Sequence, residues 1–187
     1  MNELALFCGV GGGVLGGRLL DTQVVCAVER EPYAIEVLLR RQEDGSLPPF
    51  PIWDDIKTFE GFPFRGFIDV VSAGFPCQPF SEAGKQEGED DDRNLWPDTA
   101  RVIGEVRPRT VLLENVPGLL RSYGGTVLGD LSALGYDCRW GTVSAQDAGA
   151  AHLRKRWWCV AHAQVEQPVR VQAERQRRKS ACRRGSD

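Results

Sequence analysis

The chain has 187 residues, of which 42% are apolar and 26% charged, and its net charge is -3. This length and composition are typical of one globular domain and argue against a disordered or membrane-embedded protein. Because the net charge is slightly negative, contact with nucleic acid would depend on a local basic patch or on another part of the protein.

The first half of the chain alternates short apolar runs with helical patterns. Strands are predicted over residues 4–7 and 23–28, and each is followed by a helical stretch, to about residue 20 and over residues 32–41. A short strand is expected to end near residues 54–56, and a buried strand is expected over residues 67–73. This β-α-β-α order predicts an α/β domain with a mostly parallel central sheet.

The second half continues the pattern after a long loop over residues 74–93. A helix is expected over residues 95–106, a strand over 110–114 and a helix to about 134, and the last expected strands are 136–145 and 157–161. Residues 163–187 are rich in arginine and glutamine and lack apolar periodicity, which predicts a basic, disordered tail. The expected domain division is therefore 1–162 and 163–187.

Cysteine and histidine usage argues against a metal site. The chain has two histidines and no C-x-x-C pair among its cysteines, so we expect no zinc and mostly buried thiols. The cysteines are Cys8, Cys26, Cys77, Cys138, Cys159 and Cys182. No basic leader precedes the first apolar run, and no run approaches the ~20 residues that span a bilayer, so a cytoplasmic protein is expected.

A glycine-rich turn follows the first predicted strand. Glycines there let a ligand approach the backbone closely, and Gly11-x-Gly13-x-x-Gly16 fits the dinucleotide fingerprint loosely. Glu29 ends the second strand, where a carboxylate can accept both hydroxyl groups of a ribose. The pattern favours a nucleoside-bearing cofactor, and the alternative is a tight structural turn beside a surface glutamate.

Three further segments carry candidate chemistry. Cys77 follows a buried strand and stands between Pro76 and Gln78-Pro79, which favours a rigidly presented nucleophile over a buried structural thiol. Glu114 ends another buried strand and can act as a general acid or read a base edge, or be a capping or surface residue. Alternation places Arg154 and Arg156 on one side of an extended segment. Two guanidinium groups there can bind an anionic or base-edge partner, and the alternative is a solvated basic edge.

The order and type of these segments resemble those of the DNA (cytosine-5) methyltransferases. The resemblance covers about residues 3–162. It is carried by Leu6-Phe7-Cys8-Gly9-Val10-Gly11-Gly12, Glu29, Asp55-Ile56, Gly74-Phe75-Pro76-Cys77-Gln78-Pro79-Phe80-Ser81, Gly84-Lys85, Asp91-Asp92-Arg93-Asn94-Leu95, Glu114-Asn115-Val116 and Arg154-Lys155-Arg156. It implies the Rossmann-like fold of S-adenosylmethionine-dependent methyltransferases.

The resemblance also implies a site for each part of the cofactor S-adenosylmethionine. Residues implied to contact the cofactor are Phe7, Gly9 and Gly11 along its length, Glu29 at the ribose, Asp55 and Ile56 at the adenine, and Leu95. The implied partner is double-stranded DNA with one cytosine flipped out of the stack. No metal is implied.

The implied catalytic residues are Cys77, Glu114, Arg154 and Arg156. The Cys77 thiolate would attack C6 of cytosine and make C5 nucleophilic, so that C5 takes the methyl group before Cys77 is eliminated. Glu114 would contact N3 and the exocyclic amine, and the two arginines would hold the base and the active-site loop. Residues 80–93 would form a lid over the flipped base.

The sequence departs from the family pattern in three places. The family has Asp in its first strand, where Glu3 or Ala5 stands nearby, and Pro-Gln where this chain has Ala151-His152. The family also continues into a target-recognition domain and a returning helix, which are not visible before Asp187. We therefore expect a truncated catalytic domain or half of a split enzyme, with recognition supplied by a separate chain and apolar surface left uncovered.

Three other interpretations follow from the same residues. A cytosine-5 tRNA methyltransferase would share these motifs. A non-catalytic remnant would bind cofactor or partner without turnover. A nicotinamide-dependent oxidoreductase would use the glycine turn but would give no role to Cys77 or the arginine pair. A bacterial or phage-encoded enzyme of a restriction-modification system fits the leading interpretation.

Overall fold

A computed structural model describes residues 1–76 and 94–164. Cys77, the predicted lid over residues 80–93 and most of the predicted basic tail therefore lie outside the described residues. Within the described part of the chain, no helix is long and apolar enough to cross a membrane.

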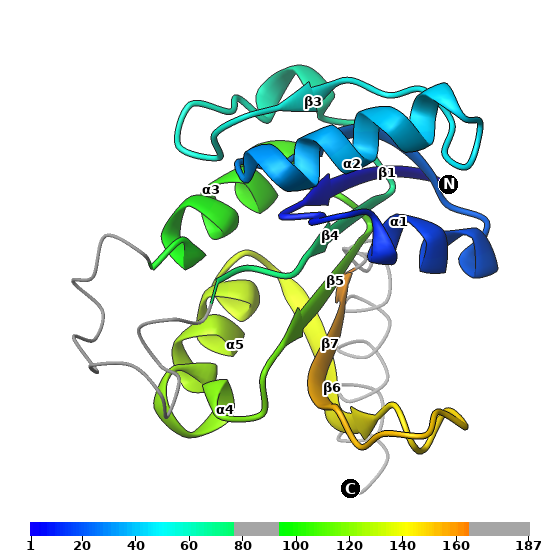
Figure 1. Cartoon of the computed structure of the whole chain (residues 1–187). Coiled ribbons are helices and arrows are strands. Elements are labelled where there is room, and N and C mark those ends of the chain that lie inside the picture. The colour runs from blue at the N-terminus through cyan, green and yellow to red at the C-terminus, as the bar shows by residue number, and fades with distance from the viewer. Residues whose placement is uncertain (77–93, 165–187) are drawn as a thin grey trace, which may run out of the picture.

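The described chain alternates strands and helices in the order expected for an α/β domain (Figure 1). The strands are β1 (Asn2–Leu6), β2 (Gln23–Val28), β3 (Ile52–Trp53), β4 (Val70–Ala73), β5 (Thr110–Asn115), β6 (Tyr136–Ser144) and β7 (Lys155–Ala163). The helices are α1 (Gly12–Gly17), α2 (Pro32–Glu43), α3 (Trp96–Val106), α4 (Leu119–Ser122) and α5 (Gly124–Ala133). Two short 3-10 turns are η1 (Arg18–Leu20) and η2 (Phe62–Phe64).

The strands form one seven-stranded sheet in the order β3-β2-β1-β4-β5-β7-β6. Strands β1 to β5 pair in parallel, and β7 lies antiparallel between β5 and β6. The predicted mostly parallel α/β sheet is therefore confirmed. Because β1 is central and the chain crosses from β3 to β4 on the far side of it, the carboxyl ends of β1 and β4 lie at a topological switch point, where such folds bind ligands.

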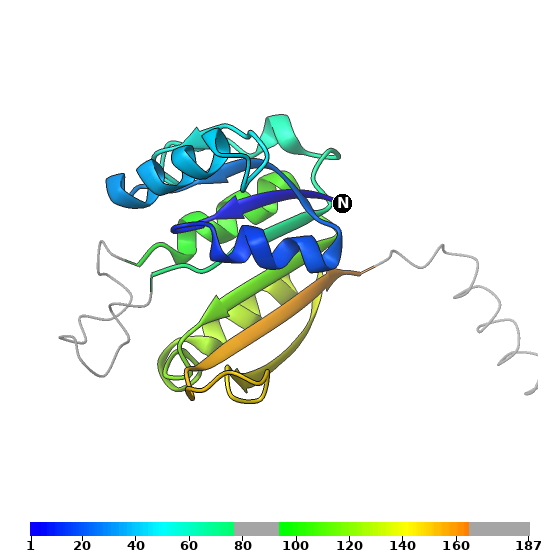
Figure 2. The same ribbon diagram turned by 45° about the vertical axis from the view of Figure 1, so that its right-hand side comes forward.

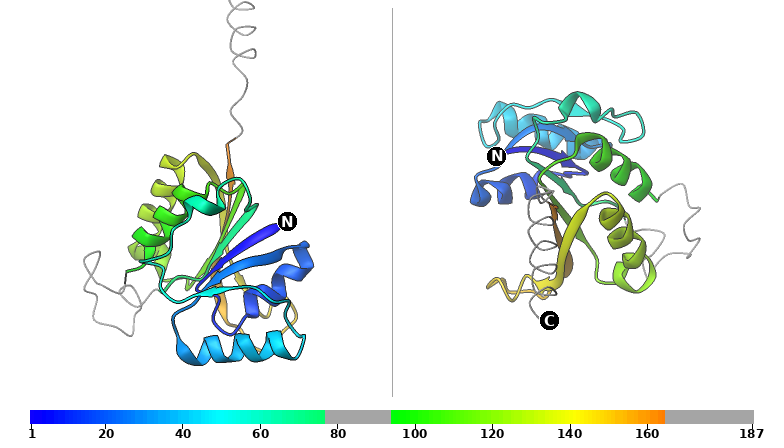
Figure 3. Two further views of the ribbon diagram at one scale, coloured as in Figure 1. Left: turned by 90° about the horizontal axis from the view of Figure 1, so that it is seen from above. Right: turned by 180° about the vertical axis from the view of Figure 1, so that it is seen from behind.

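One face of the sheet is packed under α3, α4 and α5, as seen from behind in Figure 3. Every second residue of the central strands points into this core, for example Val111 and Leu113 of β5 and Trp157 and Cys159 of β7. Helix α3 contributes Trp96, whose indole N–H donates to Asp130 Oδ2 at 2.7 Å. This core supplies most of the buried apolar area, the dominant favourable term in folding.

The opposite face is covered by α1 and α2 over β1 and β2, where a second core cluster forms. No described helix lies over β5 and β7 on this side (Figure 2). We call this bare region the open face and define it by Leu112 and Glu114 of β5 and Trp158, Val160 and His162 of β7. Although β5 is an interior strand, its residues on this side are only half-buried, and Trp158 is 39% exposed.

Two sequence predictions of secondary structure were wrong in detail. The strand expected over residues 67–73 begins only at Val70, because Phe67 and Ile68 donate backbone hydrogen bonds to Phe64 O in a turn that follows η2. The helix expected to run to about residue 134 is split into α4 and α5, because Tyr123 has φ -141 and interrupts the helical backbone. Apolar pattern alone does not separate a buried turn from a strand end.

Candidate active site

The predicted site residues that the structure describes lie at or near one edge of the sheet. The parallel strands β1 to β5 all end there, and β7 begins there because it runs in the opposite direction. Backbone hydrogen bonds from Phe7 N to Val28 O and from Glu29 N to Trp53 O continue the sheet to this edge. The ends of five strands and the start of a sixth therefore meet at the position where open α/β sheets bind ligands.

The glycine-rich turn after β1 has a left-handed backbone. Phe7, Gly9 and Gly11 have φ values of 54, 53 and 87. A Cβ on Gly11 would lie 3.0 Å from a methyl carbon of Leu38, so both conformation and packing require glycine there. The turn thus lies tightly against α2 and leaves its outer side free of side-chain bulk at Gly9, where an added Cβ would meet nothing within 4 Å.

Glu29 ties this turn to the end of β2. Its Oε2 accepts a hydrogen bond from Gly9 N at 2.7 Å, and its Oε1 accepts from Arg30 N and Glu31 N at 2.9 and 2.8 Å. A carboxylate oxygen can accept two hydrogen bonds, so Oε2 keeps capacity for a ligand hydroxyl group. The carboxylate and the side-chain-free turn fit the ribose of a nucleoside cofactor.

Asp55 and Ile56 lie in the turn after β3. Asp55 Oδ1 accepts from Lys57 N at 2.9 Å, and Asp55 Oδ2 lies 3.7 Å from Arg30 Nη1. Ile56 is buried against the main core. Leu95, directly before α3, is half-buried against the same core. The turn after β3 and the start of α3 thus pack against one core, and we call them the two walls.

The segment that leads to Cys77 is held from β5. Asn115 is buried, and its Nδ2 donates to Phe75 O at 3.0 Å while its Oδ1 accepts from Val116 N at 2.8 Å. The Phe75 ring packs on Trp96 with 5.2 Å between centroids. The sequence reasoning did not assign a role to Asn115, although its place directly after Glu114 was a usable signal. The chain therefore approaches Cys77 from a fixed position.

Glu114 and Arg156 form an ion pair at this edge. Arg156 Nε lies 2.7 Å from Glu114 Oε1, and the two side chains are 25% and 31% exposed. A Cβ on Gly74 would lie 3.4 Å from Glu114 Oε2, so the carboxylate lies beside the backbone that leads to Cys77. The pair brings together two of the predicted catalytic residues, and solvent access keeps the carboxylate available to a ligand.

A cavity of about 630 Å³ runs from this edge along the open face beneath α1. Of the predicted site residues, it is lined by Phe7, Glu114, Arg154 and Arg156. Arg154 lies just before β7 with φ 34, outside the extended segment that was predicted for it, yet it lines the same cavity as Arg156. Gly9, Gly11, Glu29, Asp55, Ile56 and Leu95 do not line it; Glu29 and Asp55 follow β2 and β3, on the other side of β1.

The floor of the cavity carries Glu3, a carboxylate to which no role was assigned from the sequence. Glu3 is buried and accepts hydrogen bonds from the hydroxyl groups of Thr22 and Ser72. It lies on the same side of β1 as Ala5, at the position where the sequence departs from its family pattern. Glu3 thereby connects β1 to Thr22, directly before β2, and to Ser72 within β4.

The thiols in the described part of the chain are unsuited to nucleophilic chemistry. Burial, and then the nearby Glu29 carboxylate, raises the pKa of Cys8 to about 12, and burial raises the pKa of Cys26 to about 11. Burial raises the pKa of Cys159 to about 12. Since the thiolate is the nucleophile, these groups are unreactive near neutral pH. Among the described residues, no group of three or more His, Cys, Asp or Glu is placed to hold a metal ion.

The sheet order, the glycine turn and the carboxylate after β2 define the Rossmann-like fold of S-adenosylmethionine-dependent methyltransferases. The family model for C-5 cytosine-specific DNA methylases matches residues 1–183. The chain belongs to this family.

Comparison with individual proteins agrees with this assignment. The chain is 36% identical over 159 residues to the Type II methyltransferase M.NgoMIV of Neisseria gonorrhoeae, covering 83% of this chain and 49% of that protein. It is 34% identical over 172 residues to M.CviJI of Paramecium bursaria Chlorella virus IL3A, covering 91% of this chain and 45% of that protein. The chain thus spans about half the length of these relatives.

A solved structure gives the same result for the fold. The S. pombe Dnmt2 methyltransferase superposes with a TM-score of 0.71 at 25% identity, over 89% of this chain and 52% of that one.

Proposed function

We propose that this chain carries the catalytic half of an enzyme that transfers a methyl group from S-adenosylmethionine to C5 of cytosine in DNA. The observation that carries the proposal is the Glu114–Arg156 ion pair beside Gly74, at the edge from which the chain continues to Cys77. Membership of the C-5 cytosine-specific DNA methylase family supports the same reaction.

The cofactor, when bound, supplies an electrophilic methyl group. Phe7, Gly9 and Gly11 would line its path, because the left-handed turn leaves the backbone open to close approach. Glu29 would accept a hydrogen bond from a ribose hydroxyl group at Oε2. Asp55 and Ile56 on one side and Leu95 on the other would hold the adenine.

The Cys77 thiolate would add to C6 of cytosine, and the C5=C6 electron pair becomes available at C5. C5 would then form its bond to the methyl group as the bond between that methyl group and the cofactor's sulfur breaks, which leaves S-adenosylhomocysteine. Loss of the C5 proton to a base returns an electron pair to the ring, which breaks the S–C6 bond and releases the thiolate. The covalent step divides one difficult substitution into easier ones. Because C6 is hidden in stacked DNA, the cytosine has to be flipped out.

Glu114 would act on the other edge of the cytosine. Its carboxyl group would hydrogen-bond to N3 and the exocyclic amine, and so stabilise the charge that develops as Cys77 adds. Arg156 holds this carboxylate at 2.7 Å and would fix its orientation. Arg154, which lines the same cavity, would help to hold the base and the active-site loop.

The cofactor assignment predicts a binding defect for Glu29→Gln. Hydrogen bonds to a charged group are stronger than neutral ones, so we expect the affinity for S-adenosylhomocysteine to fall about tenfold or more. The amide would also place an N–H group against an amide donor of the turn. Isothermal titration calorimetry measures the change.

The matched control is Glu31→Gln, which removes an exposed carboxylate that precedes α2. We expect its affinity to stay within about twofold of the wild type. Equal affinity in Glu29→Gln and wild type would contradict the ribose assignment.

We propose that the open face is the surface on which another chain of the enzyme packs. Leu112 and Val160 are half-buried and Trp158 is 39% exposed, although they belong to interior strands of the sheet. We infer that residues 1–162 form the catalytic and cofactor-binding domain, and that a separate chain packs on this face and supplies recognition of the DNA sequence. Burial of this apolar surface would drive the association.

DNA binding by the 187-residue chain alone is expected to be weak and independent of sequence. The net charge of -3 gives little counterion release on binding, and the proposed reader of the major groove lies on another chain. Gel-shift titrations with a set of duplexes of varied sequence measure this. A tight complex with one duplex and not with the others would contradict the proposal that another chain supplies sequence recognition.

The proposed setting is the cytoplasm of a bacterium, or of a phage-infected cell, as part of a restriction-modification system. The relatives named above are Type II methyltransferases of a bacterium and a virus, which supports this setting.

A further inference from the structure

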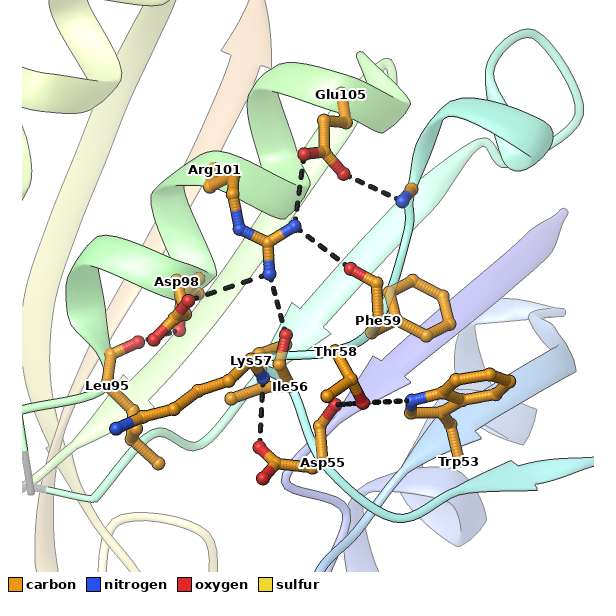
Figure 4. A network of polar contacts seen from close by, with 12 residues as sticks. Trp53, Asp55, Ile56, Lys57, Thr58, Phe59, Leu95, Asp98, Arg101 and Glu105 are labelled. Atoms are coloured by element: carbon orange, nitrogen blue, oxygen red, sulfur yellow. Dashed lines mark hydrogen bonds and ion pairs between the residues drawn. The ribbon is translucent and has the colours of Figure 1, made fainter.

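Arg101 of α3 is the centre of a polar network that connects the two walls of the proposed adenine site. Its Nη2 donates to Ile56 O at 2.7 Å and its Nη1 donates to Phe59 O at 2.9 Å. On its own helix it contacts Asp98 Oδ1 at 3.6 Å and Glu105 Oε1 at 3.0 Å. Figure 4 shows the guanidinium group between these carboxylates and the carbonyl groups of the turn.

The network fixes the turn relative to α3. The turn carries Asp55 and Ile56, while α3 continues directly from Leu95, so Arg101 lies between the backbones of both walls. The planar guanidinium group matches this arrangement because its donors have a fixed fork geometry. The Arg101 side chain is 34% exposed and Glu105 only 14%, so the contacts are partly shielded from water.

The far end of the network is also rigid. Glu105 Oε2 accepts from Gly61 N at 2.7 Å, and a Cβ on Gly61 would lie 2.9 Å from Val106 Cγ2. Gly61 is thus packed directly against α3. The chain between Asp55 and Gly61 is therefore fixed to the helix at both ends, and Arg101 holds the end that contains the proposed adenine contacts.

We propose that Arg101 is a positioning residue for the cofactor, which sets the separation of the two walls of the adenine site and thereby the preference for adenine over other purines. The inference rests on the proposed cofactor role of Asp55, Ile56 and Leu95. Arg101 touches no reacting atom, and it acts through the Ile56 carbonyl group and the adjoining Asp55 carboxylate. Cofactor affinity and purine selectivity depend on it.

Arg65, which directly follows η2, offers a matched control because it contacts the same helix. Its Nε donates to Glu105 O at 2.7 Å and its Nη2 donates to Gly104 O at 3.0 Å. Like Arg101 it makes two hydrogen bonds to backbone carbonyl groups and links a loop to α3. These contacts lie at the opposite end of α3 from Leu95. Replacing Arg65 is therefore expected to lower stability without changing the adenine site.

The experiment uses the full chain and two ligands that differ at position 6 of the purine and, with it, in the hydrogen on N1. S-adenosylhomocysteine carries an amine at position 6, which can donate a hydrogen bond to the Asp55 carboxylate. S-inosylhomocysteine carries a carbonyl oxygen there, which cannot donate one. We expect the wild type to bind the adenine compound at least about tenfold more tightly. In Arg101→Met, we expect the affinity for S-adenosylhomocysteine to fall about tenfold. The ratio of the two dissociation constants should fall to about threefold or less.

Arg65→Met is expected to keep the wild-type ratio, even where its melting temperature falls as far as that of Arg101→Met. Arg101→Lys restores one donor without the fork, and its ratio should lie between those of wild type and Arg101→Met. An unchanged ratio in Arg101→Met would overturn the inference and leave Arg101 with a purely structural role. Failure of the wild type to bind either ligand would instead reject the proposed cofactor site.

Discussion

Replacing Cys77 with alanine is expected to lower methyl transfer to DNA by at least about a thousandfold. Without a thiolate to add to C6, C5 of cytosine does not become nucleophilic. The described thiols Cys8, Cys26 and Cys159 cannot substitute, because their pKa values are raised to about 11 or 12. Transfer of tritium from labelled S-adenosylmethionine to duplex DNA measures the loss.

The cofactor site should survive this substitution. We expect Cys77→Ala to bind S-adenosylhomocysteine within about twofold of the wild type, since the nucleophile is not among the proposed cofactor contacts. Cys138→Ala, which removes a half-buried thiol from β6, serves as the control and should keep full transfer. Undiminished transfer by Cys77→Ala would refute the covalent mechanism. The same assay with tRNA as acceptor separates a DNA enzyme from an RNA enzyme.

Replacing Glu114 with glutamine should lower methyl transfer about a hundredfold or more, because an amide cannot provide the proton or the charge that N3 needs as Cys77 adds to C6. The amide would also lose its ionic contact with Arg156, now 2.7 Å away. Folding stability should change little, since both side chains are about a quarter to a third exposed and such pairs contribute little. Single-turnover transfer and thermal melting measure the two effects separately.

Glu36→Gln is the matched control for this substitution. Glu36 also pairs with an arginine, Arg40, at 2.6 Å, but both lie exposed on α2. It should retain the wild-type rate. If Glu114→Gln transfers methyl groups as fast as Glu36→Gln, then Glu114 is a surface carboxylate with no part in the reaction.

The sequence predicted the fold well where the apolar pattern agrees with residues that mark the start or end of an element. Strand β2 has the predicted bounds of residues 23–28, and α2 begins at Pro32, a residue suited to a first helical turn. The gathering of Glu29, Asp55 and Glu114 at one edge also followed from sequence, because the carboxyl ends of parallel strands meet there. The break at Tyr123 was missed, although the Gly124-Gly125 pair directly after it is a turn signal.

Contacts between distant segments could not be predicted. The ion pair of Glu114 and Arg156 requires β7 to lie antiparallel against β5, and tertiary packing decides that register. The bond from Arg101 to Ile56 O spans 45 residues, and an arginine flanked by acidic residues at helical spacing looks like an exposed helix face. No role could be assigned to Glu3 from the sequence, because nothing local shows that Thr22 and Ser72 converge on it.

The strand order has a consequence for synthesis on the ribosome. β1 emerges first but becomes an interior strand, and it must wait for β4, about seventy residues later, to cover its second edge. The proposed nucleotide site combines Gly9, Glu29 and Asp55 with Leu95, and it is complete once α3 has emerged. Glu114 meets Arg156 only when β7, the last strand, inserts between β5 and β6. A nascent chain would therefore acquire its proposed nucleotide site well before its catalytic ion pair.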